Sequence, residues 1–293
     1  MNINSIPFPV KYQSSQPVFI VSVKSGTSEI FARWMSSFLR INFETCFLTL
    51  LPVYKKTLIG DDHEVSGSDQ ILIQHIQENP CFKKWKKQFA KSLDGLGSDN
   101  IPSEEGFGNI MNRFYEILNQ HLRTVRWGEI LPALTPHVTL IHRLYPKAHW
   151  IHLLHDGRSL ADSFFRKNRF SRNIRDFARF WKYQEFHISE KLKLLPAEQV
   201  LKVKSEALFN DNGTRLDELL NFLQLDDPGF QMKRFLMNNR HKIVPEGGKW
   251  KTLTCDDILD FEQEAGELLE EYGYKLSPAN DLHLIYPARF HKY

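Results

Sequence analysis

Two short apolar runs, each followed by a turn and a helical pattern, constrain the fold of this chain most. Val18–Val23 and His149–Leu154 are rich in β-branched, leucine and aromatic residues, which is typical of strands buried on both faces. The segments after them, 28–40 and 159–167, repeat apolar residues at helical spacing. Each run therefore predicts a strand, a short loop and a helix, the unit from which parallel sheets are built.

The rest of the chain continues this alternation. Val200–Val203 predicts a third strand. Further helical patterns cover residues 69–79, 107–121, 135–145, 174–195, 214–225 and 255–272. We therefore predict an α/β fold with a central, mostly parallel sheet flanked by helices. Because no fixed-period repeat and no long linker interrupt the pattern, we expect one domain over residues 1–293.

Charge and cysteine content exclude several classes of protein. With 38 Lys and Arg residues against 35 Asp and Glu, the net charge is +3, so a general binder of nucleic acid is not expected. Three separated cysteines, Cys46, Cys81 and Cys255, offer neither a disulfide framework nor the spacing of a metal site. Since neither a signal peptide nor an apolar run of the ~20 residues that a bilayer requires is found, we expect a cytoplasmic protein without a membrane span.

The loop after the first strand has the composition of an anion site. Lys24, Ser25, Gly26, Thr27 and Ser28 combine a cation, three hydroxyls and a glycine that lets the backbone approach a ligand closely. The unpaired N–H groups at the start of the next helix favour a phosphate or sulfate there. The alternative is simple capping of the helix by Ser or Thr. Because Lys24 precedes the glycine, this is not a Walker A loop, which argues against a nucleotide-dependent kinase.

The loop after the second strand is a weaker candidate for the same chemistry. His155 ends that strand, Asp156 and Arg158 follow, and Ser163 lies eight residues after His155, so that His155 and Ser163 can face one anion. An Asp cap beside a solvated Arg is the structural alternative. Since ligands of open α/β sheets bind at the carboxyl ends of strands, the two loops together are a stronger sign than either alone.

These two units, in this order, resemble the sulfotransferase superfamily that uses 3′-phosphoadenosine 5′-phosphosulfate (PAPS). Residues 18–28 are similar to its 5′-phosphosulfate loop, and residues 149–164 to its 3′-phosphate unit, R-D-x-R followed by a serine. The other similar segments are 126–129, 203–208, 219–225, 248–251, 265–266 and 272–274. The resemblance covers about 17–274, and about 45–125 falls where the family varies with its acceptor.

The resemblance implies in-line transfer of a sulfuryl group from PAPS to a hydroxyl or amine, without a metal, leaving 3′-phosphoadenosine 5′-phosphate (PAP). Lys24 would stabilise charge on the oxygen that bridges sulfur and the leaving phosphate. The residues expected at the 5′-phosphosulfate are Lys24, Ser25, Gly26, Thr27 and Ser28. Those expected around the 3′-phosphate are His155, Arg158, Ser163, Gly248, Lys249, Trp250 and Lys251.

A general base is needed to take the proton of the acceptor. Some branches of the family use a Glu about twenty residues after the loop Lys, and Glu44 stands at that distance from Lys24. His63 is the second candidate, because other branches use a His in the middle region. The acceptor would be a small molecule, a carbohydrate or a peptide.

Three positions depart from the family pattern. His155 stands for the first Arg of R-D-x-R, Ile130 for a Lys, and Ser205 for an aromatic residue. A neutral imidazole binds phosphate less well than a guanidinium, although the phosphate could protonate His155, whose reference pKa is ~6.5. These departures keep open a second hypothesis, a catalytically degenerate sulfotransferase fold that binds a ligand or partner.

Overall fold

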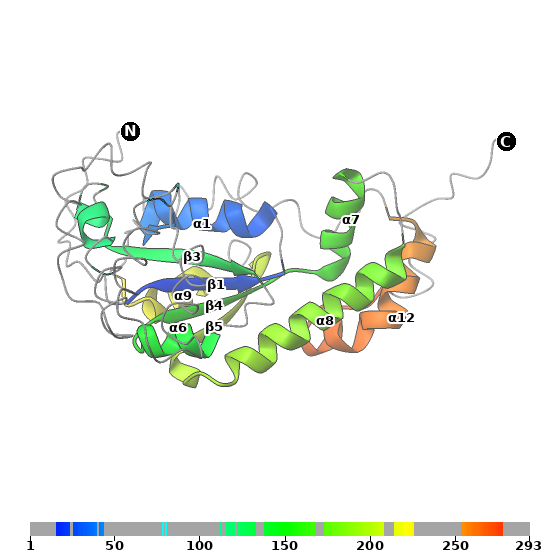
Figure 1. Cartoon of the computed structure of the whole chain (residues 1–293). Coiled ribbons are helices and arrows are strands. Elements are labelled where there is room, and N and C mark those ends of the chain that lie inside the picture. The colour runs from blue at the N-terminus through cyan, green and yellow to red at the C-terminus, as the bar shows by residue number, and fades with distance from the viewer. Residues whose placement is uncertain are drawn as a thin grey trace.

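A five-stranded parallel sheet forms the centre of the fold (Figure 1). The computed structural model describes residues 16–23, 26–39, 41–43, 78, 80, 112, 115–120, 122, 124–132, 138–167, 173–207, 214–225 and 253–277. The strands are β1 (Val18–Ser22), β2 (Ile41–Asn42), β3 (Arg126–Pro132), β4 (His149–Leu154) and β5 (Val200–Lys204). Their order is β2-β3-β1-β4-β5, and every pair is parallel, which confirms the predicted α/β class.

Helices cover both faces of this sheet. They are α1 (Gly26–Leu39), α6 (Val138–Leu144), α7 (Gly157–Lys167), α8 (Ile174–Leu192), α9 (Thr214–Phe222) and α12 (Cys255–Glu271), with a short 3₁₀ turn at Ala197–Gln199. Each agrees with a predicted helix to within a few residues. Residues 115–120 are also helical, as the pattern over 107–121 predicts. The helix predicted over 69–79 falls almost wholly outside the described residues.

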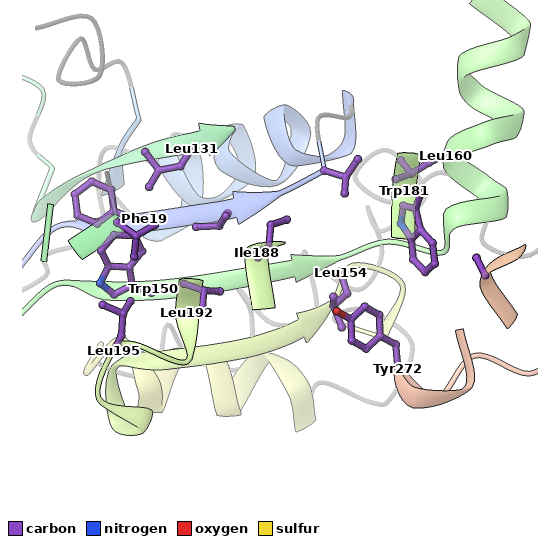
Figure 2. Packing of buried hydrophobic residues seen from close by; sticks show 14 of the residues in the cluster. Phe19, Leu131, Trp150, Leu154, Leu160, Trp181, Ile188, Leu192, Leu195 and Tyr272 are labelled. Atoms are coloured by element: carbon purple, nitrogen blue, oxygen red, sulfur yellow. The ribbon is translucent and has the colours of Figure 1, made fainter. Parts of the chain in front are cut away.

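The core has two parts because β1 and β4 are buried on both faces. On one face, Val18 and Ile20 of β1 pack with apolar residues of α1 and α9. On the other, Phe19 and Val21 pack with residues of α6, α8 and α12. Figure 2 shows the second cluster, in which Phe19 and Trp150 of neighbouring strands lie beside side chains from α8 and the turn after it. Burial on both faces explains why the segments that form β1 and β4 are apolar along their whole length.

The strand β3 was not predicted. Its sequence, Arg-Trp-Gly-Glu-Ile-Leu-Pro, carries two charged residues and a glycine and lacks the apolar run of a buried strand. Arg126 and Glu129 are nevertheless buried, and burial lowers the pKa of Arg126 to about 10. Gly128 is required by space, since a Cβ there would lie 2.5 Å from the Val18 carbonyl oxygen. Pairing with β1 therefore makes this segment a strand although its own sequence favours a strand only weakly.

A second glycine, Gly157, gives a test of this packing. A Cβ at Gly157 would lie 2.5 Å from Phe261 Cζ and 2.6 Å from Trp181 Cδ2, both in buried rings that cannot rotate away. We expect Gly157→Ala to lower the free energy of unfolding by about 1–3 kcal/mol in urea denaturation. Gly266→Ala is the matched control, because its Cβ would lie 3.4 Å from its nearest neighbour, Leu276. Equal effects of the two variants would contradict the packing described.

Candidate functional site

The carboxyl ends of β1 and β4 meet at one edge of the sheet. The two strands are neighbours in register, with Val21 paired to His152. Helix α1 begins at Gly26, four residues after β1 ends at Ser22, and α7 begins at Gly157, three residues after Leu154. Figure 1 shows both helices starting at this edge. From β1 the chain crosses to β2 on one side of the sheet, and from β4 it crosses to β5 on the other side. The gap between β1 and β4 is therefore a topological switch point, the place where open α/β sheets bind ligands.

The first predicted loop leads directly into the amino end of α1. Gly26, Thr27 and Ser28 are the first three residues of the helix, so their amides precede its internal hydrogen bonding and suit an anion. Ser28 is buried, and its Oγ accepts a hydrogen bond from Ser22 Oγ at 3.0 Å. This bond fixes the end of β1 to the start of the helix.

In the second predicted loop, the guanidinium of Arg158 is held by protein groups. Arg158 Nε and Nη2 donate to Asp156 at 3.0 and 2.8 Å, and Nη1 donates to Glu262 and, at 3.1 Å, to the Lys275 carbonyl. Burial lowers the pKa of Arg158, but the bonds and charges of the two carboxylates outweigh it, so the net shift is upward. The exposed fraction of Arg158 is 3%. Arg158 therefore acts first as a support for the loop.

The same loop is tied to β5 and to the C-terminal segment. Glu206 Oε1, just after β5, accepts from the Asp156 amide at 3.1 Å, and Tyr274 Oη donates to Glu206 Oε2 at 3.2 Å. Burial raises the pKa of Glu206. Glu262 on α12 accepts from the Ser277 amide at 3.1 Å. Three segments far apart in sequence thus fix the backbone after β4.

His155 lies at the end of β4 with its ring buried. Its exposed fraction is 3%, and its Nδ1 lies 2.8 Å from Ser205 Oγ. Among the described residues, His155 Nε2 has no hydrogen-bond partner. Burial, helped by the charge of His152, lowers the pKa of His155 to about 3. Burial therefore favours the neutral ring in the ligand-free protein, and protonation of His155 by a bound phosphate stays a prediction.

The remaining predicted residues divide into two groups. Ser163 is half-buried in the second turn of α7, eight residues after His155. The others lie outside the described residues, and their roles stay predictions: Lys24, Ser25, Glu44, His63, Gly248, Lys249, Trp250 and Lys251. Within the described part of the chain, no group of three or more His, Cys, Asp or Glu side chains could hold a metal ion.

Comparison with known families decides the class of the protein. Residues 17–229 match the sulfotransferase family. The chain belongs to the sulfotransferase family. Members of this family typically use PAPS as sulfuryl donor. A search of curated proteins finds no match.

Within the residues that the structure describes, no helix is long and apolar enough to cross a membrane.

A solved sulfotransferase domain shares the fold, and further solved structures are similar to the chain. The sulfotransferase domain of the Synechococcus PCC 7002 olefin synthase is 20% identical, with a TM-score of 0.51, over 92% of this chain and 98% of that domain. The sulfotransferase domain of the curacin biosynthetic pathway is 14% identical, with a TM-score of 0.46, over 91% and 100%. Retinol dehydratase, solved with androsterone and the inactive cofactor PAP, is 13% identical, with a TM-score of 0.39, over 92% and 84%.

The three departures from the sulfotransferase pattern fall in two places. Ile130 lies in β3 opposite Ile20 and packs against the core on the α1 side, so an apolar residue fills the position of the family's Lys. His155 and Ser205, 50 residues apart in sequence, contact each other at the carboxyl edge. Sequence reasoning noted each departure separately but gave no sign of this contact.

Sequence reasoning also missed the residues that support the loop. Glu206 and Tyr274 lie within segments that resemble the family, but their contact with the loop was not predicted. No local pattern in the sequence pointed to Glu262, because its partner Arg158 is 104 residues away. Only the folded chain brings such residues together.

Proposed function

We propose that this chain transfers a sulfuryl group from PAPS to a hydroxyl or amine of an acceptor. The main supporting observation is that the two loops predicted to hold the donor follow neighbouring parallel strands at a topological switch point. Membership of the sulfotransferase family supports the same class of reaction.

The described residues suit a donor that carries anionic groups at two places. The first amides of α1 would bind the 5′-phosphosulfate, as helix amino ends bind anions elsewhere. His155 Nε2 is a buried polar atom without a partner in the described part of the chain, and Ser163 follows it on α7. Buried polar atoms are rarely left unpaired, so a ligand group fits this place. Lys24, Ser25 and the 248–251 segment would complete the site.

The reaction would depend mainly on positioning and charge, as in phosphoryl transfer. Bound PAPS supplies a sulfuryl group joined to a good leaving group. Lys24 would stabilise the negative charge that grows on the bridging oxygen as the sulfur–oxygen bond breaks. Glu44 would accept the proton of the acceptor while the new bond from sulfur to the acceptor's oxygen or nitrogen forms, with His63 as the second candidate.

The acceptor is a small molecule, a carbohydrate or a peptide, and region 45–125 would contribute to its selection. We also propose that residues 1–293 form one domain and that the protein acts in the cytoplasm. One fold supports many acceptors, so the class of acceptor must come from experiment.

A catalytically degenerate protein is the alternative function. The observation that favours it is that His155 and Ile130 replace two cations of the family pattern, and Ile130 packs against the core. Such a protein would still bind the nucleotide or a partner at the same edge.

Incubation with ³⁵S-labelled PAPS and a panel of alcohols, amines, sugars and tyrosine peptides separates the two functions. We expect labelled product with at least one class of acceptor. Release of PAP without labelled product would indicate hydrolysis only. Binding of PAP without turnover on any acceptor would favour the degenerate alternative.

A further inference from the structure

The carboxylate of Glu206 connects segments that are far apart in sequence. Glu206 lies two residues after β5 ends, and it accepts from the Asp156 amide at 3.1 Å and from the Tyr274 hydroxyl at 3.2 Å. Burial raises the pKa of Glu206, and hydrogen bonds from the Asp156 amide, its own amide and the Ser205 hydroxyl act in the opposite direction. One carboxylate therefore joins the chain after β4, after β5 and after α12.

Tyr274 is a rigid partner for this carboxylate. Its amide donates to the Leu269 carbonyl at 2.8 Å, and Gly273 before it has a φ of 70°, the geometry that ends a helix. Lys204 Nζ lies 4.6 Å from the centroid of the Tyr274 ring and donates to the Gly273 carbonyl at 2.8 Å. Because its backbone and its ring are both held, Tyr274 presents its hydroxyl to Glu206 in one direction.

Asp156 is the residue through which Glu206 reaches α7. The Asp156 carboxylate accepts from the Arg158 amide at 2.9 Å, and its carbonyl accepts from the Leu160 amide at 3.1 Å, so Asp156 caps the helix. Ser163 lies in the second turn of the same helix. A carboxylate that fixes the Asp156 amide therefore also fixes the start of the helix on which Ser163 lies.

We propose that Glu206 is a positioning residue for binding of the 3′-phosphate, with Tyr274 as the residue that fixes it. Glu206 would act through Asp156 on the direction of α7, without touching the phosphate or the transferred group. This inference rests on the proposed function, in which Ser163 meets the 3′-phosphate. Loss of Glu206 should therefore weaken the binding of a nucleotide that has a 3′-phosphate far more than the binding of one that lacks it.

The contact itself is tested without a ligand, by hydrogen exchange of the Asp156 amide in NMR spectra of the full chain. We expect exchange about three- to tenfold faster in Glu206→Ala, the effect of losing one hydrogen bond. Glu206→Gln should stay within about twofold of wild type, because its amide oxygen still accepts. Glu198→Ala is the matched control, since Glu198 is exposed in the turn before β5. Unchanged exchange in Glu206→Ala would overturn the proposal.

Calorimetry with PAP and with AMP, which has no 3′-phosphate, measures the effect on binding. We expect Glu206→Ala to bind PAP about five- to tenfold more weakly than wild type, and AMP within about twofold. Glu206→Gln should bind both nucleotides within about twofold of wild type. In turnover, the KM for PAPS should rise in Glu206→Ala while kcat changes by less than about twofold, because a positioning residue for the 3′-phosphate does not contact the reacting atoms.

A double-mutant cycle shows whether Tyr274 acts through Glu206. Tyr274→Phe keeps the ring beside Lys204 and removes only the hydroxyl, so we expect PAP to bind about two- to threefold more weakly and AMP to be unaffected. The double variant should bind PAP no more weakly than Glu206→Ala. Tyr183→Phe is the matched control, because Tyr183 is 55% exposed on α8. Additive losses would overturn the role of Tyr274.

The outcomes separate this proposal from the proposed function. If wild type binds PAP and Glu206→Ala loses affinity for PAP and AMP equally, as general weakening of the fold would cause, the positioning role is overturned and the proposed function stands. Should Glu206→Ala fail to fold, the same comparison of PAP with AMP in Tyr274→Phe decides. Wild type that does not bind PAP would refute the proposed function and this inference with it.

Discussion

Arg158→Ala should lower the free energy of unfolding by about 3–5 kcal/mol, the usual effect of removing one partner from a buried ion pair. Arg158 is 3% exposed and is bound to both Asp156 and Glu262. Without it, two carboxylates stay in a buried place with no cation between them, and the Lys275 carbonyl loses a donor. Urea denaturation followed by tryptophan fluorescence measures the effect.

Two variants make this measurement specific. Arg175 of α8 pairs with Asp260 at 2.6 Å but is 44% exposed, so Arg175→Ala should have a much smaller effect. The loss of unfolding free energy in Arg158→Lys should lie between those of Arg175→Ala and Arg158→Ala, because an ammonium cannot reproduce the fork of a guanidinium. If Arg158→Ala weakened PAP binding without destabilising the protein, Arg158 would be a ligand residue and its supporting role would be refuted.

Lys24→Ala should lower kcat by about 10²–10³-fold while changing the affinity for PAP by less than tenfold. The reason is that charge on the bridging oxygen develops only as the bond to sulfur breaks, so Lys24 stabilises the transition state more than the bound product. Parallel measurement of turnover with ³⁵S-labelled PAPS and of PAP binding by calorimetry gives both quantities.

The control for Lys24 is a lysine that precedes the amino end of β4. Lys147 is exposed in the turn just before β4, and Lys147→Ala should leave both kcat and PAP affinity unchanged. Equal losses of kcat and affinity in Lys24→Ala would assign Lys24 to binding alone. A normal kcat in Lys24→Ala would remove it from the reaction.

Much of the fold was predictable because its strongest signals are local. The runs that became β1 and β4 are apolar over their whole length, since both faces of each strand are covered by helices. The amphipathic patterns that became α8 and α12 are long and clearly capped, by Asn173 and by a Thr254–Asp257 capping box. Such signals do not depend on distant parts of the chain.

What could not be predicted depends on tertiary contacts. The strand β3 contains Arg126 and Glu129, which no local rule places inside a sheet, and its pairing with β1 determines its conformation. The candidate site followed from the order of its motifs, but the bonds that hold Arg158 and His155 join residues 104 and 50 positions apart. The sequence alone therefore predicted Arg158 at the 3′-phosphate, but it predicted neither the contact of Arg158 with Glu262 nor that of His155 with Ser205.

Calorimetric titration of the wild-type protein with PAP, compared with AMP, tests the central claim most directly. The claim is that the carboxyl edge of β1 and β4 binds a nucleotide with anionic groups at both its 5′ and 3′ positions. We predict a dissociation constant for PAP of about 10 µM or below, and at least about tenfold weaker binding of AMP, which lacks the 3′-phosphate. No heat and no rise in Tm with PAP at about 100 µM would contradict the account.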